Sequence, residues 1–108
     1  MSDLTRDEKA TLVAVARKII SEEIDFLDGC HEIAHLLIGF PYENDQDLCI
    51  FVLVNSETDH LPLGSTRKHW DPTALEKRDK EIQNYIDRYK KDVVIASRNI
   101  ILRFTPPA

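Results

Sequence analysis

Two histidines four residues apart are the first side chains in the sequence whose spacing could support catalysis. Residues 31–35 read His-Glu-Ile-Ala-His and match the pattern H-E-x-x-H. On a helix both imidazoles of such a pair lie on one face, where they can hold a zinc ion, and the glutamate can activate a zinc-bound water. Glu57 or His60 could supply a third ligand from further along the chain. A zinc-dependent metallopeptidase is therefore one interpretation.

An ordinary helix segment explains the same residues. No third histidine follows in the spacing of the metzincin ligand set, and no convincing sheet is predicted that could hold a peptide substrate. If the apolar residues between the histidines face the core, then His31, Glu32 and His35 lie at its margin or in solvent. We favour this second interpretation and expect no catalytic residue, no bound metal and no cofactor.

A second group of functional side chains stands at residues 56–60, which read Ser-Glu-Thr-Asp-His. Asp59 and His60 could in principle exchange a proton, but adjacent side chains rarely point at one another. The spacing also matches no catalytic triad. An exposed loop with these side chains is better suited to binding a partner.

Acidic residues stand on both sides of the apolar run 48–54. If the fold brings both flanks together, they form an acidic patch that would steer a basic protein into place. If it does not, they belong to two separate solvated loops, and the sequence leaves both arrangements open. The residues predicted to bind a partner are Glu43, Asp45, Asp47, Glu57, Asp59 and His60.

The composition limits what the chain can bind. Of its 108 residues 43% are apolar and 31% are charged, an ordinary balance for a single domain over residues 1–108. The net charge of -5 disfavours binding to nucleic acid and to anionic membranes, because both repel an acidic protein. The polar N-terminus does not resemble a signal peptide, so we expect a cytoplasmic protein in which Cys30 and Cys49 are buried, reduced thiols.

Local signals predict several helices that would position these residues. A capping box at residues 5–8 starts a helix that ends near Ser21. Apolar residues continue at helical spacing over 24–38, with a bend or a new start at Asp28-Gly29 and an end at residues 39–41. Asp71 followed by Pro72 predicts another start, and this last segment reaches residue 104 as one helix or as two with a break near Asp92.

The apolar run 48–54 is too short for its periodicity to distinguish a buried strand from a buried helix. Its β-branched residues favour a strand, whereas a lone buried strand would leave backbone groups unpaired. We predict a helix with Asp47 as its N-cap, followed by a loop over 55–71. The expected fold is mainly α, a compact single-domain bundle of four or five helices, and a small β element near 48–54 is the alternative.

Two stretches of the chain resemble a known group of proteins. Residues 20–30 read Ile-Ser-Glu-Glu-Ile-Asp-Phe-Leu-Asp-Gly-Cys. Residues 51–64 read Phe-Val-Leu-Val-Asn-Ser-Glu-Thr-Asp-His-Leu-Pro-Leu-Gly, with Arg67 and Trp70 after them. Together they look like a family of small, mainly helical bacterial proteins, and the resemblance extends from about residue 17 to 104. Members of this family are similar to immunity proteins of contact-dependent growth inhibition and related toxin systems.

The resemblance implies that the chain neutralises a cognate toxin by tight one-to-one binding in the cytoplasm. It further implies a basic partner, because many such toxins are nucleases, and it implies that positions 31 and 35 need not be histidine. We therefore expect a non-enzymatic inhibitor whose acidic, partly apolar face covers the toxin's active site or substrate groove. A zinc metallopeptidase and a helical regulatory or scaffolding module that self-associates through residues 72–104 are the alternatives.

Overall fold

The computed structural model describes residues 4–61 and 68–105, and four α-helices account for most of them. The helices are α1 (Arg6–Ser21), α2 (Phe26–Leu36), α3 (Gln46–Thr58) and α4 (Pro72–Phe104). This confirms a mainly helical bundle. The described residues contain no strand, so the alternative of a small β element near 48–54 is wrong, and that run lies inside α3.

Each helix begins at a side chain that accepts hydrogen bonds from its first turn. At α1 the Glu8 N–H donates to Thr5 Oγ1 at 3.0 Å and the Thr5 N–H donates to Glu8 Oε1 at 2.8 Å, which confirms the predicted capping box. The other three helices begin at aspartates, which are Asp25, Asp45 and Asp71. The prediction of Asp47 as the N-cap of α3 is therefore wrong by two residues.

The start of α2 also differs from the prediction, because the helix passes through Asp28 and Gly29 without a break. A Cβ at Gly29 would lie 2.5 Å from Cγ1 of Ile19 on α1, closer than real Cβ contacts allow. The absence of a side chain at Gly29 therefore allows α1 and α2 to approach closely, and the glycine does not form a turn. Gly39 has a φ of +83° just beyond the last turn of α2, in agreement with the predicted end.

The C-terminal end of α3 lies further along the chain than predicted. Residues 55–58 belong to the helix and not to the expected loop 55–71, of which residues 62–67 lie outside the described residues. Thr58 is fully buried, and its hydroxyl donates to the Val54 carbonyl at 2.6 Å. α4 continues through Asp92 as one helix, so the break considered there is absent.

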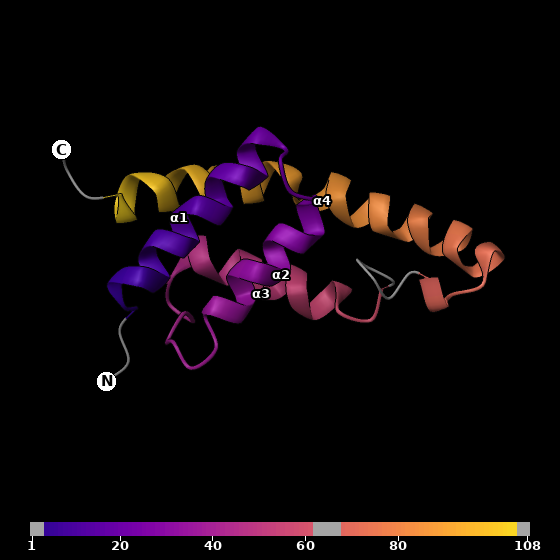
Figure 1. The fold of residues 1–108 in the computed structure, drawn as a ribbon, viewed down its shortest axis with the longest axis horizontal. Helices are drawn as coiled ribbons and strands as arrows, with labels where there is room; N and C mark the ends of the chain where they lie inside the picture. The colour runs from indigo at the N-terminus through magenta and orange to yellow at the C-terminus, as the bar shows by residue number, and fades with distance from the viewer. Residues whose placement is uncertain (1–3, 62–67, 106–108) are drawn as a thin grey trace.

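The longest helix, α4, sets the length of the molecule (Figure 1). Its 33 residues correspond to about 50 Å of helix, and the longest dimension of the molecule is 49 Å. α1 and α3 pack against α4, and α2 packs against α1 and α3. The N-terminal half of α4 extends beyond the other helices. The buried residues of α4 all lie in its C-terminal half, between Val93 and Ile100.

The core lies where all four helices meet. Its largest fully buried side chains include Leu12, Leu27, Ile33, Leu37, Leu48, Phe51 and Ile100. Because these come from every helix, the core fixes α3 against α4 as well as α1 against α2. No helix in the described part of the chain combines the length and the apolar character needed to cross a bilayer.

Candidate partner-binding groove

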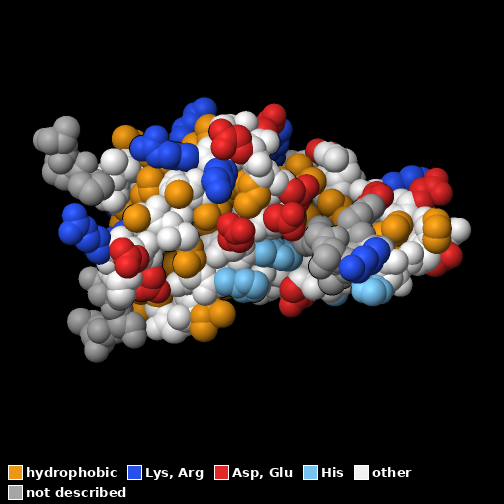
Figure 2. Space-filling model, viewed as in Figure 1, with side chains coloured by type: hydrophobic (Ala, Val, Ile, Leu, Met, Phe, Trp, Pro, Cys, Tyr) orange, Lys and Arg blue, Asp and Glu red, His pale blue; other side chains and the backbone are white. Residues whose placement is uncertain are grey.

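The residues of the H-E-x-x-H motif lie on α2 in different surroundings. His31 is half-buried, and its Nε2 lies 2.7 Å from Oγ1 of Thr58 on α3. Glu32 and His35 are exposed. Figure 2 shows histidine side chains beside acidic ones near the middle of one face of the molecule. The motif therefore combines one histidine that links two helices with two residues in solvent.

The hydrogen bond to Thr58 determines which nitrogen of His31 carries the proton. The single hydroxyl proton of Thr58 is donated to the Val54 carbonyl, so Nε2 of His31 must be the donor in the second bond. Burial lowers the pKa of His31, an effect that the nearby carboxylate of Asp28 opposes. A zinc ligand needs a free lone pair, which this Nε2 does not offer. Among the described residues no three His, Cys, Asp or Glu side chains are placed to hold a metal ion.

The first acidic flank lies at the start of α3. Asp45 caps the helix and pairs with Arg103 near the C-terminal end of α4, with an N–O distance of 2.6 Å. The carboxylate of Asp47 accepts a hydrogen bond of 3.0 Å from the side-chain amide of Asn99. Glu43 is exposed in the preceding loop. Asp45 thus stabilises the fold, whereas Glu43 and Asp47 keep a charge that no cation balances within the described residues.

The second acidic flank surrounds the other end of α3. Glu57 accepts a hydrogen bond from the hydroxyl of Tyr89 on α4, and this bond raises the pKa of Tyr89. Asp59 follows the last turn of α3 and is exposed. His60 is exposed too, with Nε2 3.8 Å from Oε1 of Glu81.

The two flanks are separate groups, because they stand at opposite ends of one helix. Asp47 and Glu57 are ten residues apart on α3, which corresponds to about 15 Å. Both contact α4, where their partners Asn99 and Tyr89 are also ten residues apart but in the reverse order. α3 and α4 therefore run antiparallel in a fixed register.

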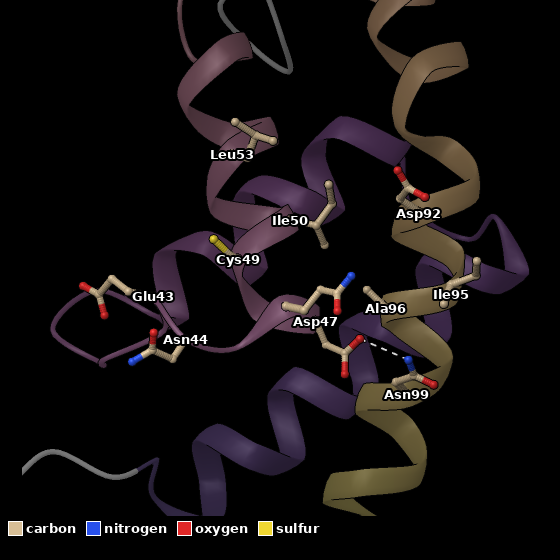
Figure 3. A pocket seen from close by; sticks show the side chains of 11 residues that line it. Glu43, Asn44, Asp47, Cys49, Ile50, Leu53, Asp92, Ile95, Ala96 and Asn99 are labelled. Carbon is tan, nitrogen blue, oxygen red and sulfur yellow. Dashed lines mark hydrogen bonds between the residues drawn. The ribbon is translucent and has the colours of Figure 1, made fainter.

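A groove of about 720 Å³ follows this antiparallel pair beside the first flank (Figure 3). We name it the α3–α4 groove. Its apolar lining consists of Cys49, Ile50, Leu53, Ile95 and Ala96. Its polar lining consists of Glu43, Asn44, Gln46, Asp47, Asp92 and Asn99. The hydrogen bond from Asn99 to Asp47 crosses between the two helices at one end of the groove, as Figure 3 shows.

The lining combines exposed apolar surface with negative charge. Leu53 is 44% exposed and Ile95 is 47% exposed, although both are large hydrophobic side chains. Glu43, Asp47 and Asp92 contribute three carboxylates, and no lysine, arginine or histidine lines the groove. Within the described residues none of these carboxylates takes part in an ion pair. The groove is therefore complementary to a ligand that is both apolar and cationic.

Sequence reasoning found two acidic residues of the groove but missed its apolar lining and the whole α4 side. One signal was present in the run 48–54. A helix cannot turn seven consecutive apolar residues toward one core, so some of them must reach the surface. Leu53 is such a residue. Asp92 and Ile95 carry no comparable signal, because only the register of α4 against α3 brings them to the groove.

The chemistry of the lining suits binding better than a reaction. Cys49 is the only strong nucleophile among the lining residues, and no histidine or lysine lies beside it there to activate its thiol. No protein-family model, curated protein or solved structure gives a significant match to the chain. The groove and its charges are therefore the features of the molecule that indicate a function.

Proposed function

We propose that this protein is an immunity protein, which binds a cognate basic toxin and neutralises it by covering the toxin's active site or substrate-binding groove. The observation that carries the proposal is the α3–α4 groove, where exposed Leu53 and Ile95 lie beside three carboxylates without a cationic partner. A matching ligand must bring apolar side chains and positive charge together. A protein surface supplies both.

Charge would act first on the rate of association. The chain carries a net charge of -5, and the groove adds a local concentration of carboxylates. Such a field can raise the association rate with a basic protein by roughly 10- to 1000-fold at low salt. A nuclease has to present cationic groups to bind a phosphate backbone. An acidic inhibitor that pairs with the same groups excludes the nucleic acid by direct competition.

Apolar contact would then slow dissociation. Full burial of a leucine or isoleucine side chain contributes about 1.5–3 kcal/mol, and roughly half of Leu53 and Ile95 is already buried. Each therefore contributes about 1 kcal/mol on binding. A standard interface covers about 800 Å² on each partner, or roughly 28 Å across. One partner could thus cover the groove and also reach Glu57, Asp59 and His60, which lie four to seven residues beyond Leu53.

Rescue of cells from the toxin tests the proposal. The chain is co-expressed in bacteria with each candidate toxin domain from the genes next to its own, each protein under its own inducer, and growth is followed after toxin induction. We expect growth to be restored and a one-to-one complex to form, as measured by size-exclusion chromatography with light scattering. Growth arrest in the presence of folded protein, with no complex, would contradict the proposal.

A pair of charge-reversal variants shows whether the groove carries the effect. Glu43→Lys with Asp92→Lys reverses two of its three carboxylates. Glu32→Lys with Glu76→Lys makes the same change in net charge at exposed acids that do not line the groove. We expect only the first pair to abolish rescue, with most of the loss in the association rate. Equal effects of the two pairs would assign the result to net charge alone.

A further inference from the structure

We infer that the α3–α4 groove receives an amphipathic helix of the partner, which lies along α3 and α4 and carries two cationic side chains about seven residues apart with apolar residues midway between them. This inference rests on the proposed function and specifies which element of the toxin is bound. It follows from the length, the walls and the charge spacing of the groove.

The walls of the groove are two helical segments in antiparallel register. The lining runs from Gln46 to Leu53 on α3 and from Asp92 to Asn99 on α4. Each segment covers seven residue steps, or about 10 Å, which equals two helical turns. A third helix can lie in the furrow between two such walls, because helices pack by placing the side-chain ridges of one into the grooves of another.

A helix fits these walls better than an extended segment does. A partner strand binds by adding backbone hydrogen bonds to an open sheet edge. Both walls are helical, so their interior N–H and C=O groups are already paired along the chain. An extended peptide would find no backbone partners along this furrow and would leave its own polar groups unpaired.

The carboxylates of the groove stand near its two ends. Asp47 meets Asn99 at one end, and Asp92 lies seven residues before Asn99 on α4, so the two ends are about 10 Å apart. Ile50, Ile95 and Ala96 belong to the apolar lining between these ends. On a partner helix, residues seven apart share one face at the same 10 Å spacing. Two cationic side chains of the partner helix would therefore meet the carboxylates at the two ends of the groove, while an apolar pair between them contacts the apolar lining.

A second copy of this chain is a poor occupant of the groove. It would bring a net charge of -5 to a surface that already holds three carboxylates without an ion-pair partner in the described part of the chain. Like charges at close range oppose association. The occupant that the charges favour is thus a basic helix of another protein.

Binding of designed peptides tests the inference with the intact protein. The probe is a fluorescein-labelled, alanine- and glutamine-rich helical peptide with two lysines at i and i+7 and two leucines midway. One control peptide has glutamates in place of the lysines. A second control carries a central proline that breaks the helix. Fluorescence anisotropy should show that the lysine peptide binds at least about tenfold more tightly than either control.

Matched protein variants locate the site. Ile95→Lys places a positive charge in the groove, whereas Ile38→Lys makes the same change at an exposed side chain after α2 that does not line the groove. We expect Ile95→Lys to weaken peptide binding at least about tenfold, because it removes an apolar contact and repels the lysines, and Ile38→Lys to change it less than about twofold. Far-UV circular dichroism checks that both variants are folded.

Thiol alkylation gives a second measure in the unmodified protein. Cys49 was expected to be buried, but it is only half-buried, because it lines the groove. Cys30 is fully buried, and burial raises its pKa to about 12, so it stays unreactive. Iodoacetamide should therefore label Cys49 first. The lysine peptide should lower the rate of this labelling in proportion to the fraction of the protein that has bound the peptide.

The outcomes separate this inference from the proposed function. Absence of binding up to the solubility limit of the lysine peptide, equal binding of the proline or glutamate peptide, or undiminished alkylation of Cys49 would overturn the helix-in-groove inference. Toxin rescue that persists in Ile95→Lys would also overturn it while leaving the proposed function in place. Peptide binding without toxin rescue would contradict the function alone.

Discussion

Replacing Gly29 with alanine tests the close contact between α1 and α2 at this residue. Inside an exposed helix, alanine stabilises by about 1 kcal/mol relative to glycine, because glycine loses more backbone freedom on folding. At Gly29 the added Cβ would lie 2.5 Å from Cγ1 and 2.9 Å from Cδ1 of Ile19, and 3.2 Å from Cγ2 of Ile24. Ile19 is only 5% exposed and is held in the core, so it cannot turn into solvent.

The expected change in the free energy of unfolding is the gain in helix propensity minus the cost of the steric overlap with Ile19. An extra methyl group in a packed core costs about 1–3 kcal/mol, which equals or exceeds the gain of about 1 kcal/mol in helix propensity. Gly29→Ala should therefore lower the free energy of unfolding by up to about 2 kcal/mol. Ile19→Ala removes both Cγ1 and Cδ1, so in that background Gly29→Ala should instead raise it by about 1 kcal/mol. The change of sign corresponds to a coupling free energy of about 1–3 kcal/mol.

Urea unfolding followed by far-UV circular dichroism measures the four proteins of this cycle. All four are measured in the same concentration of sucrose, because Ile19→Ala alone costs about 2–5 kcal/mol and the osmolyte strengthens the folded state. Ala10→Gly, on the exposed side of α1, calibrates the propensity difference in the same chain. If Gly29→Ala stabilises the otherwise unchanged chain, or if the two substitutions are additive, the close approach of α1 and α2 is refuted.

Two further predictions concern the link between α2 and α3. Thr58→Val removes the buried hydroxyl that accepts from His31 and donates to Val54, and urea unfolding should show a loss of about 1–3 kcal/mol. Thr11→Val removes an equivalent bond on the exposed side of α1 and should change stability by less than about 0.5 kcal/mol, so equal losses would contradict the role of Thr58. Burial lowers the pKa of His31 in the folded protein, so as the pH falls the unfolded chain takes up the proton first. The stability that neutral His31 contributes is therefore fully present above pH about 6.5, and it is lost as the pH falls toward the lowered pKa of the folded state. His31→Gln should therefore flatten the stability profile as the pH falls below about 6.5. An equally flat profile for His35→Gln, the exposed control on α2, would argue against this assignment.

Helix starts were predictable because their signals act within a few residues of the backbone. The capping box at Thr5 and the Asp71-Pro72 start each satisfy free N–H groups of the adjacent turn, so the chemistry is complete in the local sequence. The same rule misplaced the start of α3, since Asp45 and Asp47 are both competent caps. Asp45 carries the additional ion pair with Arg103, which no local pattern contains.

Other predictions were wrong where a tertiary contact, and not the local sequence, decides the structural role of a residue. Gly29 was interpreted as a helix breaker, but its missing side chain makes room for Ile19, ten residues earlier. Thr58 was assigned to the loop predicted over 55–71, directly after the apolar run 48–54. Its hydroxyl does bond to the backbone of its own helix, yet His31 on α2 holds it in the core. Neither contact can be derived from spacing along the chain.

The α3–α4 groove required a register between segments about fifty residues apart. Acidic residues at its α3 end were visible in the sequence, and so was the surplus of apolar residues over 48–54. Which of those apolar residues stays exposed depends on how α2 and α4 pack on α3, and this places Leu53 outside the core. Ile95 faces the groove for the same reason, although its helix looks amphipathic throughout.

The number of helices bears on the proposed mode of binding. The sequence predicts four or five, and the described residues contain four. α2 and α4 cover two sides of α3, and a fifth helix over the α3–α4 groove would cover Leu53 and Ile95 as well. A partner helix would take that place on binding. Exposed apolar groups favour unspecific association, which like charges beside them oppose. The three carboxylates would therefore keep the free protein monomeric and reserve the groove for a cationic helix.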